Sequence, residues 1–320
     1  MRILVTGGMG FIGSNFIHYW FRKYPKDEII NLDKLTYAAN LKNIEGVERY
    51  RYEFIKGDIA NIKVVDKIVK DVDMIVNFAA ESHVDKSISN SAEFVHSNII
   101  GTHTLLDAAK RYEKRFHQIS TDEVYGTLSL KDKRKFDENS PYLPRNPYAA
   151  TKAAADHLVR TYYNTYKLKV TISNCSNNFG PRQHPEKLIP ETIISGLRNT
   201  NIPIHGTGLQ VRDWIYVEDH CSAIEKILMN GRYGETYLVG ANQEMSVIDM
   251  VKFIFKKLGK NEELISFVED RPGQDLRYAI DASKMKEEFG WQRKYEFEES
   301  IKLTIGWYKK MLDQNKYVVS

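Results

Sequence analysis

The feature that most restricts the fold is an alternation of short apolar runs with helical patterns across the first 176 residues. Runs that predict strands occupy Arg2 to Thr6, Ile29 to Leu32, Tyr52 to Ile55, Met74 to Phe78, Arg115 to Ser120 and Lys169 to Asn174. Apolar residues recur at helical spacing in Phe11 to Tyr24, Val64 to Lys70, Glu93 to Arg111 and Pro147 to Tyr166. This alternation predicts right-handed strand–helix–strand crossovers and a parallel sheet.

The pattern changes after about residue 178, where prolines become frequent and the predicted elements shorten. Two later segments, Asp213 to Val217 and Thr236 to Val239, still look like pieces of the first sheet. We therefore predict an α/β fold with a doubly wound parallel sheet, a Rossmann domain. This domain spans residues 1–176, with sheet pieces near 213–217 and 236–239. Residues 177–320 form a smaller, partly interleaved α/β substrate domain. The charged segment Lys131 to Glu138 predicts a solvated loop.

Composition excludes several classes of protein. The chain has 320 residues, 42% of them apolar, which is enough for a sizeable core. Positive and negative residues are interleaved along the chain and leave a net charge of +4. This mild excess disfavours nucleic-acid binding and allows an anionic small molecule as ligand. Cys175 and Cys221 are too few for a disulfide framework or a zinc site, so we expect small buried residues and no metal. The N-terminus lacks a signal-peptide pattern and no apolar run reaches membrane length, so we expect a cytoplasmic protein without a membrane partner.

A glycine-rich turn follows the first predicted strand. Gly7, Gly10 and Gly13 in GGMGFIG allow backbone N–H groups to approach a pyrophosphate at a helix N-terminus. Asp33 ends the second strand twenty residues after Gly13, where a carboxylate accepts hydrogen bonds from ribose hydroxyls and repels a ribose phosphate. The pattern predicts a dinucleotide site that prefers NAD to NADP, a preference that Lys34 softens slightly. The alternative is a purely structural turn.

Other candidate ligands lie at the ends of strands, because ligands of open α/β sheets bind beyond the carboxyl ends of the strands. Asp58 and Ile59 follow the third strand and could flank the adenine, although a turn aspartate is equally consistent with the sequence. Ala79-Ala80 and Ser120-Thr121 follow the fourth and fifth strands.

Tyr148 and Lys152 lie four residues apart, on one face of the helix after the fifth strand. A lysine ammonium beside a phenol favours the phenolate and lowers the phenol pKa. Such a phenolate can take a proton from a sugar hydroxyl while hydride leaves for NAD. A surface tyrosine–lysine pair is the alternative.

This tyrosine–lysine spacing after a GxxGxxG turn resembles the extended short-chain dehydrogenase/reductase family. Within that family the chain is similar to the dTDP-glucose 4,6-dehydratases. The motifs that carry the similarity are NFAAESHVDKSI, STDEVYG, YAATKAAAD, NCSNNFGPRQHPEKLIP, VRDWIYVEDH and RPGQDLRYAID. They cover nearly the whole chain, in the family's order.

The resemblance implies an NAD-dependent hydro-lyase that converts dTDP-glucose to dTDP-4-keto-6-deoxyglucose. C4 is oxidised, water is eliminated across C5–C6, and hydride returns to C6. Glu123 would be the base at C5, Asp122 the acid at C6, Thr121 a hydrogen-bond partner of the C4 hydroxyl, and Tyr148 the base for C4 oxidation, with Lys152 beside it. Without the resemblance, Asp122-Glu123 would be interpreted as a solvent-facing acidic pair at a helix start.

The resemblance also implies two sets of binding residues. Those expected at NAD are Gly7, Gly10, Phe11, Ile12, Gly13, Asp33, Lys34, Thr36, Asp58, Ile59, Ala79, Ala80, Ser82, Asn98, Ser120, Tyr148, Lys152 and Asn178. Those expected at the nucleotide-diphosphate hexose are Ser82, His83, Thr121, Asn177, Lys187, Leu188, Pro203, Ile204, His205, Arg212, Arg271, Gln274 and Asp275. Arginine suits this second site because its guanidinium binds phosphate oxygens in pairs.

The sequence departs from the family pattern at several positions, most of which map near the nucleotide. They are His205 for tyrosine, Gln274 for histidine, Val247 for asparagine, Arg182 and His184 for aromatic residues, and Asn174 for arginine. The departures leave the base and the hexose open. A UDP-linked or N-acetylated hexose, a 4-epimerase, and a non-catalytic NAD-binding regulator remain alternatives.

The apolar stripes of Glu93 to Arg111 and Pro147 to Tyr166 could pack on the sheet, or pair with a second subunit in a four-helix interface as the resemblance implies, and we predict a homodimer.

Overall fold

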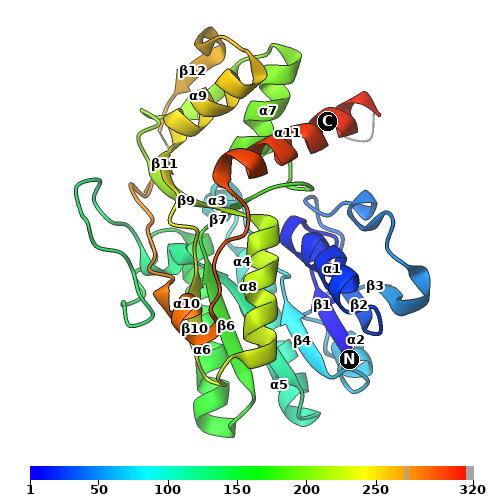
Figure 1. The fold of residues 1–320 in the computed structure, drawn as a ribbon. Coiled ribbons are helices and arrows are strands. Elements are labelled where there is room, and N and C mark those ends of the chain that lie inside the picture. The colour runs from blue at the N-terminus through cyan, green and yellow to red at the C-terminus, as the bar shows by residue number, and fades with distance from the viewer. Residues whose placement is uncertain (271–272, 315–320) are drawn as a thin grey trace.

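A seven-stranded parallel sheet forms the centre of the computed structural model, which describes residues 1–270 and 273–314 (Figure 1). Every neighbouring pair of its strands is parallel. In order across the sheet, the strands are β10 (Thr236–Val239), β6 (Val170–Cys175), β5 (Arg115–Thr121), β4 (Met74–Asn77), β1 (Arg2–Thr6), β2 (Glu28–Asp33) and β3 (Tyr52–Lys56). The order reverses beside β1, as in a doubly wound fold, so the predicted fold class is confirmed.

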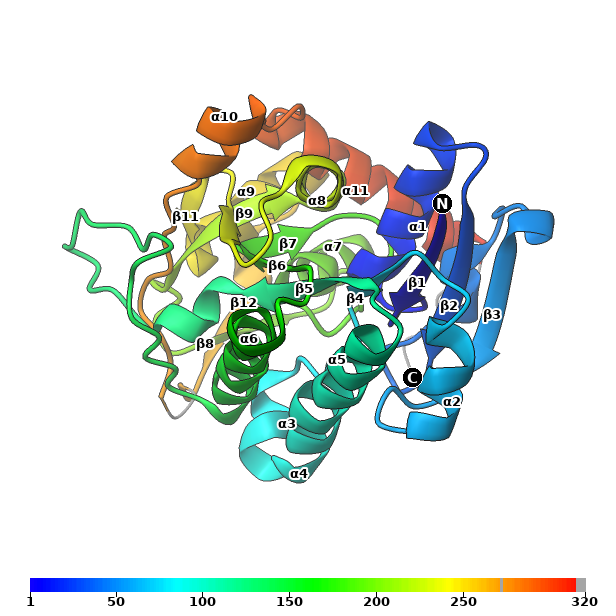
Figure 2. The ribbon, with the colours of Figure 1, turned by 90° about the horizontal axis from the view of Figure 1, so that it is seen from below.

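Helices cover both faces of this sheet, which explains why its inner strands are nearly continuous apolar runs. One face carries α1 (Phe11–Lys23) and α8 (Val217–Asn230), and the other carries α2 (Ile62–Val69), α5 (Thr102–Arg111) and α6 (Pro147–Tyr166) (Figure 2). Ile3 and Val5 of β1 pack toward the first face, whereas Leu4 packs toward the second. The alternation along one strand therefore fills both layers of the core.

Of the two later segments expected in the large sheet, only β10 joins it. The prediction for 213–217 is wrong, because β9 (Val211–Tyr216) is the middle strand of a three-stranded sheet with β7 (Asn177–Phe179) and β11 (Glu244–Ser246). β7 begins two residues after β6 ends, and it holds β9 by parallel pairing. An apolar run identifies a strand but not its partner, because pairing is a non-local property.

The smaller lobe consists mainly of α7 (Leu188–Arg198), α9 (Val247–Leu258) and α11 (Phe297–Asp313) (Figure 1). They share a core around Ile193, Trp214 and Ile254, and a two-stranded sheet of β8 (Ile202–His205) and β12 (Ile265–Val268) flanks them. Because α8 and β10 return to the large sheet, the two lobes interleave along the chain. The division into domains at residue 176 stays a prediction.

The predicted helix Glu93 to Arg111 contains a change of winding. It is built from α4 (Ala92–Phe94), the π-helical segment η3 (Val95–Gly101) and α5. Wider turns of this kind occur frequently at functional sites. The buried Asn98 lies within this segment.

The remaining elements are short: η1 (Leu41–Ile44), η2 (Arg49–Arg51), α3 (Val84–Ser89), η4 (Asp122–Tyr125), η5 (Glu262–Leu264) and α10 (Ser283–Phe289). Cys175 and Cys221 are free and buried, as expected. Among the described residues, none of the helices combines the length and apolar character that a membrane crossing requires.

Candidate active site

A cavity of about 320 Å³ opens at the carboxyl ends of β1, β2, β4, β5 and β6. This is where a doubly wound sheet places its ligand. The cavity is lined at one end by the glycine turn and at the other by the residues that follow β5 and β6.

The glycine turn is shaped to admit a close ligand. Gly7 has φ +67°, and a Cβ there would lie 2.7 Å from the backbone nitrogen of Ala79. A Cβ on Gly13 would lie 2.5 Å from the Gly7 carbonyl oxygen. α1 begins at Phe11, and its N-cap residue Gly10 provides no side-chain cap; the first turn has no acidic residue. The first N–H groups of α1 therefore suit an anion such as a pyrophosphate, and the residues present fit a dinucleotide.

The Asp33 carboxylate lies at the end of β2 and is fixed by two backbone groups. Its Oδ2 accepts a hydrogen bond from Met9 N at 2.9 Å, and its Oδ1 accepts one from Leu35 N at 2.8 Å. Burial raises the pKa of Asp33, and these two hydrogen bonds oppose the rise. Lys34 is engaged elsewhere, because its Nζ lies 3.0 Å from Asp58 Oδ2. The Lys34 charge, predicted to soften the NAD preference slightly, is directed at Asp58.

Tyr148 and Lys152, the predicted catalytic pair, lie in the first turns of α6. Asn146 caps this helix by accepting from Ala149 N at 2.8 Å, and Pro147 takes its first position. Tyr148 and Lys152 are both buried and both line the cavity. Lys152 Nζ donates to the Ile119 carbonyl at 2.6 Å.

The pKa of Tyr148 is shifted upward, opposite to the lowering expected from Lys152. Burial, followed by the nearby Glu123 carboxyl, raises the pKa of Tyr148 well above 10, while a hydrogen bond with Thr121 opposes the rise. The sequence interpretation considered only the neighbouring ammonium and could not include the loss of water around the phenol.

Asp122 and Glu123 begin η4, immediately after β5, and both line the cavity. Thr121 caps this turn by accepting from Glu123 N at 3.3 Å. Asp122 is only 2% exposed, and its Oδ2 has no hydrogen-bond partner within the described parts of the chain. The pair is therefore not a solvent-facing acidic turn.

The pKa of Asp122 is raised well above 4, by burial and then by the Glu123 and Asp213 carboxyls. Glu123 is placed differently. Its Oε2 accepts from Asn146 Nδ2 at 3.4 Å and from the Tyr278 hydroxyl at 3.5 Å. Burial raises its pKa as well, but Arg212 opposes that rise first. One carboxyl is thus held as an acid, while its neighbour is surrounded by donors that favour the anion.

The cavity brings together most of the predicted residues. All five catalytic candidates line it, and so do all the cofactor candidates except Asn98. Asn98 lies behind the wall, where it accepts from Glu81 N at 2.9 Å and donates to Thr151 Oγ1 at 2.9 Å. It therefore joins the loop after β4 to α6.

Of the substrate candidates, Ser82, Thr121, Asn177 and Lys187 line the cavity. The others lie outside its lining: His83, Leu188, Pro203, Ile204, His205, Arg212, Gln274 and Asp275. Arg271 lies outside the described residues. Ile204 packs into a core cluster, so its side chain is not available to a ligand.

Arg212 lies next to the cavity wall and organises the segment after β12. Its guanidinium stacks 4.2 Å above the Tyr278 ring, and its Nη2 donates to the Asp275 carbonyl at 3.0 Å. The Tyr278 hydroxyl contacts both Asp275 Oδ2 at 2.5 Å and Glu123 Oε2 at 3.5 Å. The region expected to bind nucleotide thus contacts the Glu123 carboxyl through one phenol.

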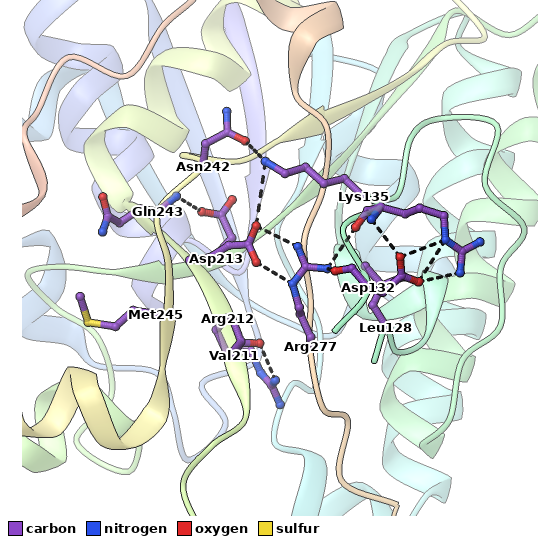
Figure 3. Close-up of polar contacts among 12 residues, drawn as sticks. Leu128, Asp132, Lys135, Val211, Arg212, Asp213, Asn242, Gln243, Met245 and Arg277 are labelled. Atoms are coloured by element: carbon purple, nitrogen blue, oxygen red, sulfur yellow. Dashed lines mark hydrogen bonds and ion pairs between the residues drawn. The ribbon is translucent and has the colours of Figure 1, made fainter. Parts of the chain in front are cut away.

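A second set of contacts joins the segment after β12 to the loop after η4 (Figure 3). Arg277 forms a two-point ion pair with Glu244 of β11, with its Nε 2.6 Å from Oε2, and its Nη1 donates to the Asp132 and Arg134 carbonyls. Leu128 N also donates to the Arg277 carbonyl at 3.0 Å. The segment Lys131 to Glu138, predicted as a solvated loop, is anchored at its base by this arginine.

Several site residues were not predicted. Asn146, Gln183, His184, Glu186 and Tyr278 line the cavity or contact Glu123. Asn146-Pro147 was detectable, because Asn followed by Pro is a strong helix-start pattern. The contact of Tyr278 with Glu123 spans 155 residues and has no local sequence signal.

Residues 4–304 match the family model described as GDP-mannose 4,6 dehydratase. The chain belongs to this family. A curated relative is the dTDP-glucose 4,6-dehydratase of Mycobacterium tuberculosis, 46% identical over 310 residues, or 97% of this chain and 93% of that protein. The predicted resemblance is therefore confirmed.

Solved structures with the same fold include members of two reaction classes. The dTDP-glucose 4,6-dehydratase of Streptomyces venezuelae with NAD bound matches with a TM-score of 0.94 and 41% identity, over 98% of both chains. The UDP-glucose 4-epimerase of Thermotoga maritima matches with a TM-score of 0.90 and 27% identity, over 98% of this chain and all of that one. The 4,6-dehydratase family shares its fold with epimerases, so the reaction must be argued from the site.

Proposed function

We propose that the chain is an NAD-dependent hydro-lyase that converts dTDP-glucose to dTDP-4-keto-6-deoxyglucose. The observation that carries this proposal is the Asp122–Glu123 pair, with Asp122 buried and Glu123 half-buried, in the same cavity as Tyr148 and Lys152. The high identity to dTDP-glucose 4,6-dehydratases supports it.

NAD, when bound, supplies the hydride acceptor for C4 and, in its reduced form, the hydride donor for C6. Its positive charge favours loss of the Tyr148 proton. Gly7, Gly10 and Gly13 would hold its pyrophosphate and Asp33 its adenosine ribose. Thr121 and Tyr148 would bind the C4 hydroxyl, and Tyr148 would take its proton. The C4 carbonyl formed in this way acidifies the proton at C5.

The two carboxyls then divide the elimination between them. Glu123, surrounded by Asn146, Tyr278 and the Arg212 charge, would accept the C5 proton as a carboxylate. Asp122, held protonated by burial and two nearby carboxyls, would give its proton to the departing C6 hydroxyl. The reaction needs opposite protonation states in neighbouring groups, and the two surroundings differ in the required direction.

A nucleotide-sugar 4-epimerase returns hydride to C4 and requires no acid and base at C5 and C6. The Asp122–Glu123 pair would then have no chemical task, although burying a carboxyl such as that of Asp122 is costly. A non-catalytic NAD-binding regulator would not need the buried Tyr148–Lys152 pair. Both alternatives leave site residues without a function.

The base and the hexose are proposed from the relatives rather than from pocket geometry. His205 and Gln274 depart from the family pattern, and Val247 begins α9. A 4,6-dehydratase acting on another, UDP-linked nucleotide hexose is therefore the second candidate.

We also propose a homodimer and a cytoplasmic location. Val95 and Ile100 of η3 are 41% and 47% exposed, and these apolar side chains on a cavity-forming helix favour a subunit contact. A mass corresponding to a monomer by light scattering at micromolar concentration would contradict the dimer.

The proposed activity is tested by offering dTDP-glucose, UDP-glucose, UDP-N-acetylglucosamine and GDP-mannose to the NAD-loaded protein. A 4-keto-6-deoxy product that absorbs in alkali, formed from dTDP-glucose without net NADH, is the expected result. Recovery of only a C4 epimer would show that the reaction is epimerisation. Tight NAD binding without turnover of any hexose would favour the regulator.

A further inference from the structure

Asp156 is a buried carboxylate for which the proposed reaction has no use. It lies on α6, one turn beyond Lys152, and its side chain has no exposure to solvent. Its Oδ2 accepts hydrogen bonds from Ser120 Oγ at 2.7 Å, the Tyr142 hydroxyl at 3.0 Å and Asn174 Nδ2 at 3.1 Å. Its Oδ1 has no hydrogen-bond partner in the described part of the chain. A buried carboxylate with one free oxygen requires a compensating positive charge.

The direction of the Tyr142 hydrogen bond favours the ionised form of Asp156. Arg160 Nη2 lies 2.6 Å from the Tyr142 oxygen, and a guanidinium can only donate. The Tyr142 oxygen therefore accepts from Arg160, which leaves its hydrogen for Asp156. Arg160 also stacks 4.5 Å above the Tyr142 ring. Arg160 thus supports the carboxylate through an intervening phenol.

The same contacts reach the residues that line the cavity. Asn174 donates to the Thr121 carbonyl at 3.1 Å as well as to Asp156, while Ser120 binds Asp156 directly. Lys152 Nζ donates to the carbonyl of Ile119. Three successive residues of β5 are thus held by Lys152, Asp156 and Asn174.

We propose that Asp156 is a positioning residue that keeps Lys152 in its charged form and holds Ser120 and Thr121 in place beside it. This inference deepens the proposed function and rests on it for the role of the Tyr148–Lys152 pair. Lys152 and Asp156, four residues apart on one helix, lie near enough for their opposite charges to stabilise each other.

The electrostatic surroundings agree with this geometry. Burial lowers the pKa of Lys152, and Asp156 is the first of the groups that oppose the decrease, followed by Cys175. Burial likewise raises the pKa of Asp156, and the Lys152 charge is the first to oppose it. Other titratable or charged groups that act on the pair are Cys175 on β6, Tyr125 on η4, and Tyr142 and Arg160. Tyr148 lies one turn before Lys152 on α6.

Asp156→Asn keeps the size of the side chain and removes its charge. Without the carboxylate, burial acts on Lys152 with less opposition, so the ammonium should lose its proton at a lower pH. An opposite charge at this range changes a pKa by about one unit or more. Both NAD affinity and turnover should therefore begin to fall at a pH lower by about one unit in the variant.

The matched control is Asp219→Asn. Asp219 is an equally buried aspartate on α8, and it accepts from Lys294 N at 2.7 Å, outside the cavity lining. Full-length wild type and both variants are titrated with NAD from pH 6 to 10, and the dissociation constants are measured by calorimetry. Turnover of dTDP-glucose is then measured over the same range. The NAD titration does not depend on the dehydration step, so it still tests Asp156 if no hexose turns over.

The alkaline limit is the pH above which NAD affinity falls. The proposal is supported if this limit is lower in Asp156→Asn than in wild type and unchanged in Asp219→Asn. An unmoved limit, whatever the loss of activity or thermal stability, overturns it and leaves a structural role. If Asp156→Asn does not fold, Arg160→Gln decides in its place, because this half-buried arginine supports the carboxylate indirectly. In Arg160→Gln, a smaller downward shift of the alkaline limit of NAD affinity supports the proposal, and an unchanged limit overturns it.

Discussion

Asp122→Asn should slow dehydration strongly and at the same time stabilise the fold. The Asp122 side chain is 2% exposed, and its Oδ2 has no partner among the residues that the structure describes. Asparagine has nearly the same shape but cannot give up an acidic proton. Loss of general acid catalysis at C6 typically lowers a rate by about 10²- to 10⁴-fold.

The gain in stability follows from the raised pKa of Asp122. The folded state binds this proton more tightly than the unfolded state, so its contribution to stability declines as pH rises above the unfolded pKa, near 4. The loss is about 1.4 kcal/mol for each pH unit until the folded pKa is reached. Asparagine does not titrate, so the free energy of unfolding of the variant should rise relative to that of wild type by this amount for each pH unit. Each kcal/mol corresponds to about 1.5 °C in the melting temperature of a chain this large.

The assay compares the thermal unfolding of wild type and Asp122→Asn at pH 5 and pH 8, with turnover of dTDP-glucose measured in parallel. Asp71→Asn, on an exposed turn, provides the same change in charge at the surface. The difference in melting temperature between Asp122→Asn and wild type should widen from pH 5 to pH 8, while Asp71→Asn should show no such trend. A constant difference would refute the protonated state of Asp122, and wild-type turnover would refute its role as the acid.

Three further predictions concern the same cavity. Glu123→Gln should still oxidise C4, seen as NADH absorbance on mixing with dTDP-glucose, while product formation falls by about 10²- to 10⁴-fold; dehydration at the wild-type rate would disprove its role as the base. Gly13→Ala should weaken NAD binding at least about tenfold in calorimetry, because its Cβ would lie 2.5 Å from the Gly7 carbonyl oxygen; Gly306→Ala, with open space around its Cβ, should leave the affinity unchanged. Asp33→Ser should reduce the preference for NAD over NADP about tenfold or more, since the repulsion of a ribose phosphate is lost; equal ratios of the two dissociation constants in variant and wild type would contradict this assignment.

Local signals in the sequence accounted for the elements that position the site. Arg2–Thr6 is a strand in the structure over the predicted range, because a buried parallel strand is a continuous apolar run. Pro147–Tyr166 is a helix over the predicted range, with Tyr148 and Lys152 on one side. Both signals depend only on neighbouring residues, so they can be interpreted without the tertiary structure.

Properties that depend on distant residues could not be predicted in the same way. The sheet in which β9 lies is set by β7 and β11, more than thirty residues away on either side. The direction of the Tyr148 pKa shift depends on burial by segments that the sequence does not place together. The contact of Tyr278 with Glu123 and the π-helical winding around Asn98 are further examples. Each of these properties arises from contacts between distant residues, and those contacts form only when the chain folds.

The fold alone does not choose between dehydration and epimerisation, because structures of both classes match this chain with TM-scores of 0.94 and 0.90. A sheet, a glycine turn and a Tyr148–Lys152 pair are sufficient for C4 oxidation in either reaction. The choice depends on what the chain does with the intermediate ketone, and that requires groups at C5 and C6. Asp122 and Glu123 are the two groups proposed for this, and their neighbours differ. Burial, then Glu123 and Asp213, raise the pKa of Asp122, and Arg212 opposes that rise only after them. Burial also raises the pKa of Glu123, but there Arg212 is the first group to oppose the rise. Because Arg212 and Asp213 are adjacent on β9, one strand of the smaller sheet acts on both carboxyls, and a change of either residue should alter elimination more than oxidation.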